Sequence, residues 1–587
     1  MFEKEYITQK ILLFFSMIFI LSFAGKYLST KNGISSYEGS TYAISSTSDA
    51  LAESPYNNSV YNTKELKKNV TEQPYFFSVY HIGQYITEMA DDYKNASILA
   101  KSSSSYTNKD WIENSYYTSL LSVADEDKFN YSAVIDNCTT AQKAPLYYCI
   151  LHTVSSIFGS LSLYRLGFSI NVCFLFLSSF LILSIGKKYL HASWAGLAAA
   201  LLFSLSLGCF SGTICATPYI MTIFFLLLIT SLHLSGIAKK ELPNYLLESM
   251  AIIHVIGNLT NYSYILFSTA LFVCFAIVLL CFRRVHDLLK YTFANLVALL
   301  ATVLIYPASM LHGATAFFKL KQDVSSFFSL DTLKKACSTN LSVLNGQLFV
   351  KTGLLLGFTL LILVLSAAVL KRDTFKNNFL NFKLRIAQQD MADIFLVALI
   401  VAYFIAIALF YHSELYFVLM TLLPFIALII CYICYRLCNA AIHSEFNSGL
   451  LGIVGTCLLC FLTIATSTPK YVYADEVTQL NFASAYGKEY CIFLSSDALN
   501  PADHVLELQK YEHSIVLDEN SLSSLKYNQT FLSQDKVLVY LSNKDYVTNK
   551  MDTIAKYGDF NISHELTNYN DKHSNRVYVY QLTKMKE

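Results

Sequence analysis

Repeated apolar segments of about 20 residues are the feature that most constrains what this chain can fold into. A helix needs ~20 mostly apolar residues to cross the hydrocarbon core of a bilayer, because each residue adds only ~1.5 Å of length. The sequence predicts about eleven such spans, at 11–29, 167–187, 193–211, 214–236, 246–260, 262–282, 291–311, 351–370, 391–411, 416–437 and 449–468. We therefore expect a polytopic α-helical membrane protein.

The composition agrees with this fold class and excludes several functions. The chain is 54% hydrophobic and 14% charged, whereas soluble domains carry ~25% charged residues. The formal net charge of +1 argues against a nucleic-acid-binding protein. The sequence contains neither a Walker motif nor a Gly-rich dinucleotide-binding loop, so nothing supports ATP-driven transport.

A further apolar segment, 144–160, is short and carries His152. Basic residues beside membrane spans are biased to the cytoplasmic side. If the amino terminus is cytoplasmic and 144–160 does not fully cross, every basic cluster falls inside: Lys187 with Lys188, Lys239 with Lys240, Arg283 with Arg284 and Lys290, Lys371 through Arg385, and Arg436. A full span at 144–160, the twelfth, would invert all of them. We therefore predict a re-entrant or interfacial helix there.

The same topology predicts four regions in a plasma-membrane protein. Residues 1–29 form an uncleaved anchor, and 30–143 form a long outer loop with nine Lys and fourteen Asp or Glu residues. Residues 144–468 form the multi-span domain. The tail, 469–587, alternates apolar runs such as KVLVYL and RVYVYQL with amphipathic stretches, which is typical of a small α/β domain. This tail is expected on the extracytoplasmic side.

Polar residues gather at the predicted outer ends of the spans. A carboxylate at a membrane surface can act as a base for an acceptor hydroxyl, and a lysine can bind a phosphate, so such a set suits a lipid-linked substrate. Tyrosines at that level are also common as a plain aromatic belt. The set comprises Glu38, Lys143, Tyr147, Thr217, Tyr219, Asn261, His412 and Glu414.

A metal centre is not expected from this sequence. The cysteines at 431, 434 and 438 have spacings that suggest ligands, but they lie in an aliphatic helix and lack a fourth ligand. Core packing is the favoured interpretation of these cysteines. Whether a divalent metal takes part in any reaction stays open.

The order of several short motifs resembles family 39 and the aminoarabinose-transferase type of GT-C membrane glycosyltransferases, a group that includes dolichyl-phosphate-mannose–protein mannosyltransferases. The matching segments are Lys143-Ala144-Pro145-Leu146-Tyr147-Tyr148, Tyr164-Arg165-Leu166, Gly186-Lys187-Lys188, Trp194-Ala195-Gly196-Leu197, Ala216-Thr217-Pro218-Tyr219, Thr260-Asn261-Tyr262 and Glu414-Leu415-Tyr416. The resemblance covers roughly residues 1–470 and is divergent.

This resemblance implies transfer of a sugar from a polyprenyl-phosphate donor to an acceptor of the cell envelope (glycan, lipid or protein), on the outer face and with inversion. The family's base is an acidic residue in the first outer loop, and the local counterpart is Glu38 in Tyr37-Glu38-Gly39-Ser40-Thr41-Tyr42-Ala43. Lys143 is the candidate for the donor phosphate. Tyr147, Tyr219, Glu414 and Tyr416 are further candidate binding residues.

The chain also departs from the family pattern. A single Glu38 followed by glycine replaces the usual Asp-Glu pair, and Leu415 stands where a late arginine is expected. Fewer cations therefore remain to stabilise a phosphate leaving group. Either Lys143 and the long first loop hold the donor, or activity has been lost and the protein is an envelope scaffold. A lipid or solute transporter is a third possibility, although no internal repeat supports it.

Overall fold

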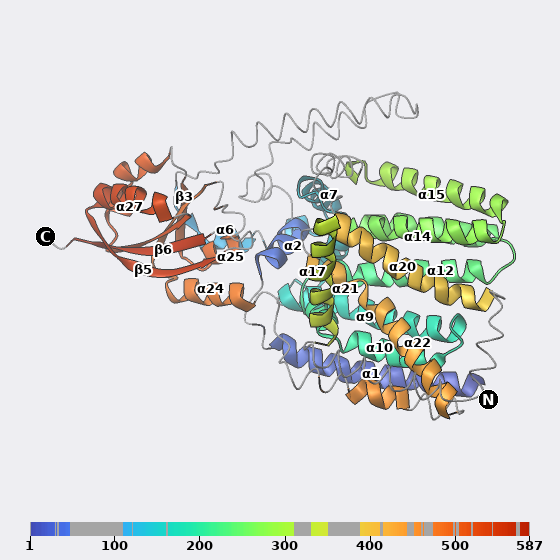
Figure 1. The fold of residues 1–587 in the computed structure, drawn as a ribbon. Coiled ribbons are helices and arrows are strands. Elements are labelled where there is room, and N and C mark those ends of the chain that lie inside the picture. Colours follow the sequence, from blue (N-terminus) through green and yellow to red (C-terminus); the bar gives the residue numbers. More distant parts are fainter. Residues whose placement is uncertain are drawn as a thin grey trace, which may run out of the picture. The chain divides into compact units, whose positions relative to one another are not determined.

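The computed structural model describes residues 2–29, 31, 35–46, 110–119, 121–159, 163–309, 330–349, 388–410, 415–442, 451–458, 462, 474–496, 499, 504–517, 521–542, 544–570 and 576–585 (Figure 1). The chain forms two compact units. The first, here called the membrane unit, comprises Met1–Thr30, Ala144–Tyr147 and Gly167–Tyr471. The second, the sheet unit, comprises Lys31–Lys143, Tyr148–Leu166 and Val472–Glu587. Segments of the predicted outer loop and of the tail thus belong to one compact unit.

The membrane unit is helical throughout its described residues. Its helices are α1 (Phe2–Ser29), α9 (Leu163–Lys188), α10 (Ser193–Ser204), α11 (Leu207–Ile214), α12 (Tyr219–Ile237), α13 (Asn244–Thr260), α14 (Ser263–Cys281), α15 (Val285–Ile305), α17 (Leu330–Leu348), α20 (Gln388–Phe410), α21 (Leu415–Met420) and α22 (Leu423–Ile442). Within the described residues, six helical segments are long and apolar enough to cross a membrane. The prediction of a polytopic membrane protein is confirmed at this level.

The count of about eleven spans stays a prediction. The predicted span 351–370 lies outside the described residues, and only 451–458 and 462 are described of the span 449–468. The shortest predicted span, 246–260, forms the 17-residue helix α13. Helix α17 lies between the predicted spans 291–311 and 351–370, and it runs across the direction of the long helices of the bundle (Figure 1).

The predicted span 193–211 is broken. Helices α10 and α11 meet at an angle of 57°, and the pair counts as a seventh crossing only if both halves belong to one span. The Ser206 side chain begins α11 by accepting a hydrogen bond from the backbone N–H of Cys209 at 3.2 Å. Asn171 of α9 donates from Nδ2 to the carbonyl of Cys215 at 2.6 Å. Ser206 thus satisfies a backbone N–H at the break, and Asn171 satisfies a carbonyl at the other end of α11.

Gly186 and Gly196 lie in two of the matching segments and have a role in helix packing. A Cβ atom added to Gly186 would lie 2.5 Å from the Cα of Gly196, so the backbones of α9 and α10 meet where neither residue has a side chain. Small residues at helix contacts allow such close approach inside a membrane. The Gly186-Lys187-Lys188 and Trp194-Ala195-Gly196-Leu197 segments therefore carry a packing requirement.

The apolar segment 144–160 forms α8 (Leu146–Ile157), which has 12 residues. At ~1.5 Å per residue it is ~18 Å long, well short of the ~30 Å hydrocarbon core. The helix is therefore too short to cross a bilayer by itself. Its predicted interfacial or re-entrant position stays a prediction, as does the orientation of the termini.

The sheet unit contains a six-stranded mixed sheet of order β1-β3-β2-β4-β6-β5. The strands are β1 (Ile112–Glu113), β2 (Tyr490–Leu494), β3 (His513–Leu517), β4 (Lys536–Ser542), β5 (Phe560–Asn570) and β6 (Arg576–Lys584). Strands β2, β3 and β4 are parallel, whereas β1, β5 and β6 pair antiparallel. Strand β1 comes from the predicted outer loop and was not predicted.

Both faces of this sheet are covered, which explains why its central strands are almost continuously apolar. Ile492, Val539 and Leu582 face a core that includes Met551 of α27 (Lys544–Gly558). The alternate residues face a second core formed with α24 (Ala474–Ala485), α25 (Val505–Leu508) and α6 (Asn114–Ser119). Strands β4 and β6 coincide with the apolar runs KVLVYL and RVYVYQL.

Candidate functional site

The candidate base Glu38 lies in the first turn of α2 (Ser36–Ser46) and forms an ion pair with Lys31. The Lys31 Nζ atom lies 2.6 Å from Oε1 and 2.7 Å from Oε2 of Glu38. The two side chains are 1% and 0% exposed, respectively. Both charges are therefore removed from water, and they stabilise each other only as a pair.

Glu38 also helps to begin helix α2. Its backbone N–H donates to the Ser35 Oγ atom at 3.2 Å, and the Ser35 N–H donates back to Glu38 Oε2 at 3.4 Å. A serine followed three residues later by a glutamate forms such a reciprocal capping box, which satisfies two backbone N–H groups at a helix start. The Ser35-Ser36-Tyr37-Glu38 sequence thus places the carboxylate by local structure alone.

The glycine that follows the carboxylate has a packing role. A Cβ atom added to Gly39 would lie 3.2 Å from side-chain atoms of Leu506, in the short helix α25 of the sheet unit. This distance is tighter than ordinary van der Waals contact, so a larger residue would require the Leu506 side chain to shift by a few tenths of an ångström. Gly39 therefore allows a close contact between α2 and α25.

Helices α7 (Tyr131–Thr140) and α8 hold the other end of α2. Asn137 of α7 donates from Nδ2 to the Ile44 carbonyl at 3.2 Å, and both groups are buried. His152 of α8, the histidine noted in the sequence, lies with Nδ1 2.7 Å from the Ser45 carbonyl. A short helix of 11 residues is only marginally stable alone, so these tertiary contacts fix its position.

Lys143, the candidate phosphate ligand, lies near the start of α2. Its Nζ atom is 5.6 Å from the centre of the Tyr37 ring, which is within the range of a cation–π contact. The side chain is half-buried. Tyr37 directly precedes Glu38, so the sheet unit brings the lysine and the carboxylate to the same end of one helix.

The aromatic candidates of the membrane unit form a separate cluster. Tyr219, at the start of α12, is fully buried and stacks on Phe417 with ring centres 5.6 Å apart. The Tyr416 hydroxyl donates to Ser211 Oγ at 3.1 Å, and Gln347 Nε2 donates to the Tyr416 carbonyl at 2.6 Å. These contacts join α11, α12, α17 and α21.

The remaining candidates are placed as follows. Tyr147 is fully buried in the first turn of α8. Glu414 and His412 lie outside the described residues. Thr217 is buried beside Tyr219, and Asn261 caps the start of α14 by accepting a hydrogen bond from the Ser263 N–H at 2.9 Å.

Lys31 is the residue that sequence reasoning missed. Its position seven residues before Glu38 gives no helical spacing that would predict a pair, because residues 32–34 separate it from α2. The signal that was available is the Ser35-x-x-Glu38 capping box, which orients the carboxylate toward the preceding chain.

This arrangement has a chemical consequence. A carboxylate acts as a general base when one oxygen reaches the proton it accepts. Because Lys31 contacts both oxygens of Glu38, the observed state is that of a closed ion pair. Among the residues that the structure describes, no group of three or more His, Cys, Asp or Glu side chains is arranged to hold a metal.

Comparisons with known proteins give limited similarity. No family model and no curated protein sequence matches the chain. The solved structures that are similar include ArnT from Cupriavidus metallidurans bound to undecaprenyl phosphate, with a TM-score of 0.40 and 11% identity over 78% of this chain and 93% of that chain. The apo structure of the same protein has a TM-score of 0.40 and 10% identity, over 85% of this chain and 98% of that chain. The Archaeoglobus fulgidus oligosaccharyltransferase has a TM-score of 0.36 and 13% identity, over 74% of this chain and 64% of that chain. Similarity at these scores does not establish a shared activity.

Proposed function

We propose that this chain is a membrane glycosyltransferase that moves a sugar from a polyprenyl-phosphate donor to a cell-envelope acceptor on the outer face. The acceptor hydroxyl oxygen attacks the anomeric carbon, the bond from that carbon to the phosphate oxygen breaks, and the polyprenyl phosphate leaves. Glu38 accepts the hydroxyl proton. Attack opposite the leaving group inverts the configuration at the sugar.

The observation that carries this proposal is the buried Glu38–Lys31 pair at the start of α2. Lys143 contacts the ring of Tyr37, the residue that precedes Glu38. Burying a carboxylate costs free energy that a capping role alone does not require, because an exposed glutamate caps a helix equally well. In the proposed cycle, acceptor binding separates Lys31 from one carboxylate oxygen. Lys143, half-buried against Tyr37, then neutralises charge on the leaving phosphate.

The test uses the full-length protein in proteoliposomes with a panel of polyprenyl-phosphate hexoses and pentoses. Because Glu38→Gln also leaves the Lys31 charge without its partner, the double variant Lys31→Met/Glu38→Gln is the informative one. It is expected to remain folded and to transfer no sugar. Transfer at the wild-type rate by a folded double variant would exclude Glu38 as the base. Glu113→Gln, at an exposed carboxylate of the same unit, is the matched control and should not change the rate.

A second candidate function is a non-catalytic relative that acts as an envelope scaffold. The closed ion pair favours it, since both oxygens of Glu38 are held by Lys31. The two functions differ in ligand binding. A glycosyltransferase should bind a polyprenyl-phosphate sugar with an affinity that falls about tenfold or more in Lys143→Met, since a lost charge-assisted contact is worth ~1.5–3 kcal/mol. A scaffold should show no such Lys143-dependent binding.

A further inference from the structure

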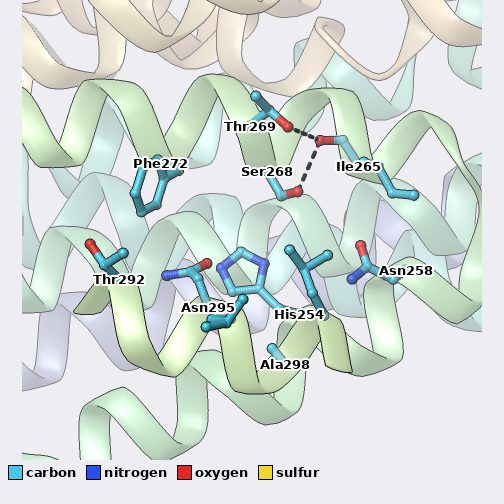
Figure 2. Close-up of a pocket in the computed structure, with 11 residues that line it drawn as sticks. His254, Asn258, Ile265, Ser268, Thr269, Phe272, Thr292, Asn295 and Ala298 are labelled. Atoms are coloured by element: carbon cyan, nitrogen blue, oxygen red, sulfur yellow. Dashed lines mark hydrogen bonds between the residues drawn. The ribbon is translucent and has the colours of Figure 1, made fainter. Parts of the chain in front are cut away.

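A pocket of about 320 Å³ lies within the membrane unit, between α13, α14 and α15 (Figure 2). None of its lining residues is charged. His254 and Asn258 of α13 line it, and their Nε2 and Oδ1 atoms have no hydrogen-bond partner. Both atoms are enclosed by protein, so a molecule in the pocket does not reach them. These two atoms therefore define no ligand.

A group of exposed apolar side chains lies on the sheet unit, around α7 and α8. Single exposed apolar residues are common on any protein, but a contiguous group marks a surface that contacts protein or lipid. Five residues between 36% and 58% exposed make up this group, here called the α7–α8 surface: Phe129, Tyr131, Ile135, Ile157 and Phe158.

Hydrogen bonds between the two helices bring these residues together. The Tyr131 hydroxyl lies 3.0 Å from Thr153 Oγ1 on α8. Tyr131 and Ile135 are four residues apart on α7, and Thr153 and Ile157 are four residues apart on α8. Residues at this spacing share one face of a helix. The exposed apolar faces of α7 and α8 are therefore adjacent.

Phe129, which precedes α7, extends this surface at considerable conformational cost. Its backbone φ is 63°, in the left-handed region that a bulky residue rarely adopts. The Phe129 N–H donates to Ser156 Oγ at 3.2 Å, which places Phe129 beside Ile157 and Phe158 at the end of α8. A strained backbone that presents an exposed aromatic ring indicates a role for that ring.

The chain leads from this surface directly into the bilayer. Helix α8 ends at Ile157, and the membrane-crossing segment of α9 begins at Arg165. Arg165 lies seven positions after Phe158, and seven residues extend over ~25 Å at most. The first residues of α8, up to Tyr147, belong to the membrane unit. The α7–α8 surface therefore lies close to one side of the membrane.

The charged residues just before this surface are mainly acidic. Asp125, Glu126 and Asp127 form the short helix η1 (Asp125–Asp127), and Lys128 forms an ion pair with Asp125 at 2.6 Å. Asp125 is 95% exposed. Carboxylates are repelled by the negative surface potential of anionic lipids. The charges beside the surface thus favour zwitterionic over anionic lipid.

We propose that the α7–α8 surface inserts into the surface of a zwitterionic phospholipid bilayer. Its apolar side chains lie at the boundary between head groups and acyl chains, with the Tyr131 hydroxyl at head-group level. This surface extends beyond the predicted interfacial helix at 144–160, because it includes α7 and Phe129. Asn137 and His152 hold α2 to α7 and α8, so insertion also sets the depth of α2 relative to the lipid head groups.

The experiment uses the full-length protein in phosphatidylcholine proteoliposomes that contain a radiolabelled fraction of this lipid. The photoreactive residue p-benzoylphenylalanine replaces Phe129 or Phe158, and in the control it replaces Tyr527, a 77% exposed aromatic residue of the same unit. After irradiation, the yield of lipid adduct should be about tenfold higher at Phe129 and Phe158 than at Tyr527, since only the first two contact lipid. Phe158 keeps the test informative if replacement of the strained Phe129 prevents folding.

A charge placed in the surface tests the cause of the adduct. Ile157→Glu changes an exposed position and should lower the yield at Phe158 about threefold, because a charged side chain resists insertion. Ser523→Glu, at an exposed position of η3 (Leu522–Tyr527), is the matched control and should leave the yield unchanged.

Four outcomes would overturn the proposal. The first is an equal yield of lipid adduct at Phe129, Phe158 and Tyr527. The second is a crosslink to a second copy of the chain in place of lipid. The third is an unchanged yield at Phe158 in the Ile157→Glu protein. The fourth is a higher yield when phosphatidylglycerol replaces part of the phosphatidylcholine, because the acidic residues beside the surface repel anionic lipid.

Discussion

The start of α2 and the pocket between α13, α14 and α15 use buried polar groups in opposite ways. At α2, Lys31 and Glu38 form an ion pair, and the Glu38 carboxylate also accepts a hydrogen bond from the Ser35 N–H in the capping box. In the pocket, His254 and Asn258 are uncharged, and each keeps one atom without a partner. At α2 the buried polar groups bond to each other and fix the start of the helix, whereas His254 and Asn258 each leave one bonding position unused.

The largest effect is expected from breaking the saturated site. Lys31→Met leaves the Glu38 carboxylate buried without its counter-charge and should lower the free energy of unfolding by ~3–5 kcal/mol. Lys31→Met/Glu38→Gln should recover most of this loss, since glutamine retains the capping box. Denaturant unfolding of the purified protein measures both. A single variant as stable as the wild type would show that the ion pair does not hold α2.

The exposed pair Lys128–Asp125 is the matched control for that measurement. Its Nζ to Oδ1 distance is also 2.6 Å, but the side chains are 40% and 95% exposed. Water and salt screen such pairs, so Lys128→Met should leave the unfolding transition unchanged.

A second prediction concerns the packing that positions the pocket. A Cβ atom at Gly257 would lie 2.3 Å from the Tyr264 ring, which contacts His254. Gly257→Ala should therefore cost ~1–3 kcal/mol of stability and displace the Tyr264 ring. Gly346→Ala on α17, where an added Cβ atom meets nothing within 4 Å, is the control and should not destabilise. Equal stability of the two variants would contradict the packing described for α13 and α14.

A third prediction tests how α2 is held by α7. Asn137→Asp keeps the shape of the side chain but removes the donor to the Ile44 carbonyl. Leaving that buried carbonyl without its partner should cost ~1–3 kcal/mol. Hydrogen exchange of the α2 amides, compared with those of α27, reports whether the loss is local to α2. Exchange that is unchanged in α2 would mean that this bond does not fix the helix.

The last prediction concerns the alkylation rate of Cys138 in α7, which reports whether α2 separates from α7. Burial raises the pKa of this thiol well above its usual range, so little reactive thiolate is present near pH 8. Alkylation should therefore be slower than in the unfolded chain by about tenfold or more. Lys31→Met should speed alkylation if separation of the ion pair loosens α2 from α7. Fast alkylation in the folded wild-type protein would show that this region is already open.

Features governed by local pattern could be predicted from the sequence. The membrane class, the short helix at 146–157 and the strands around Val537 and Val579 follow from apolar length and alternation. The capping box at Ser35 and Glu38 is likewise visible in the sequence. Each depends on residues that are close together along the chain.

The rest depends on contacts between distant residues. Lys31 could not be assigned to Glu38, because the chain between them follows no regular structure that fixes a spacing. The pocket was missed for a similar reason. Only the packing of α13 against α14 and α15 brings His254 together with Asn295 and Ser268. Strand β1 is two residues long, too short for any alternation to show.

The pairing of strand β1 with β3 constrains how many times the chain crosses the bilayer. Glu113 of β1 pairs with His513 of β3, and Trp111 donates from Nε1 to Asn528 Oδ1 at 3.0 Å. Strands cannot pair through a hydrocarbon core, so these residues lie on one side of the membrane. The chain between them must then cross an even number of times. Of the eleven predicted spans, one precedes residue 113, and the ten that remain satisfy this parity. An added crossing at 144–160 would break it unless another span were lost.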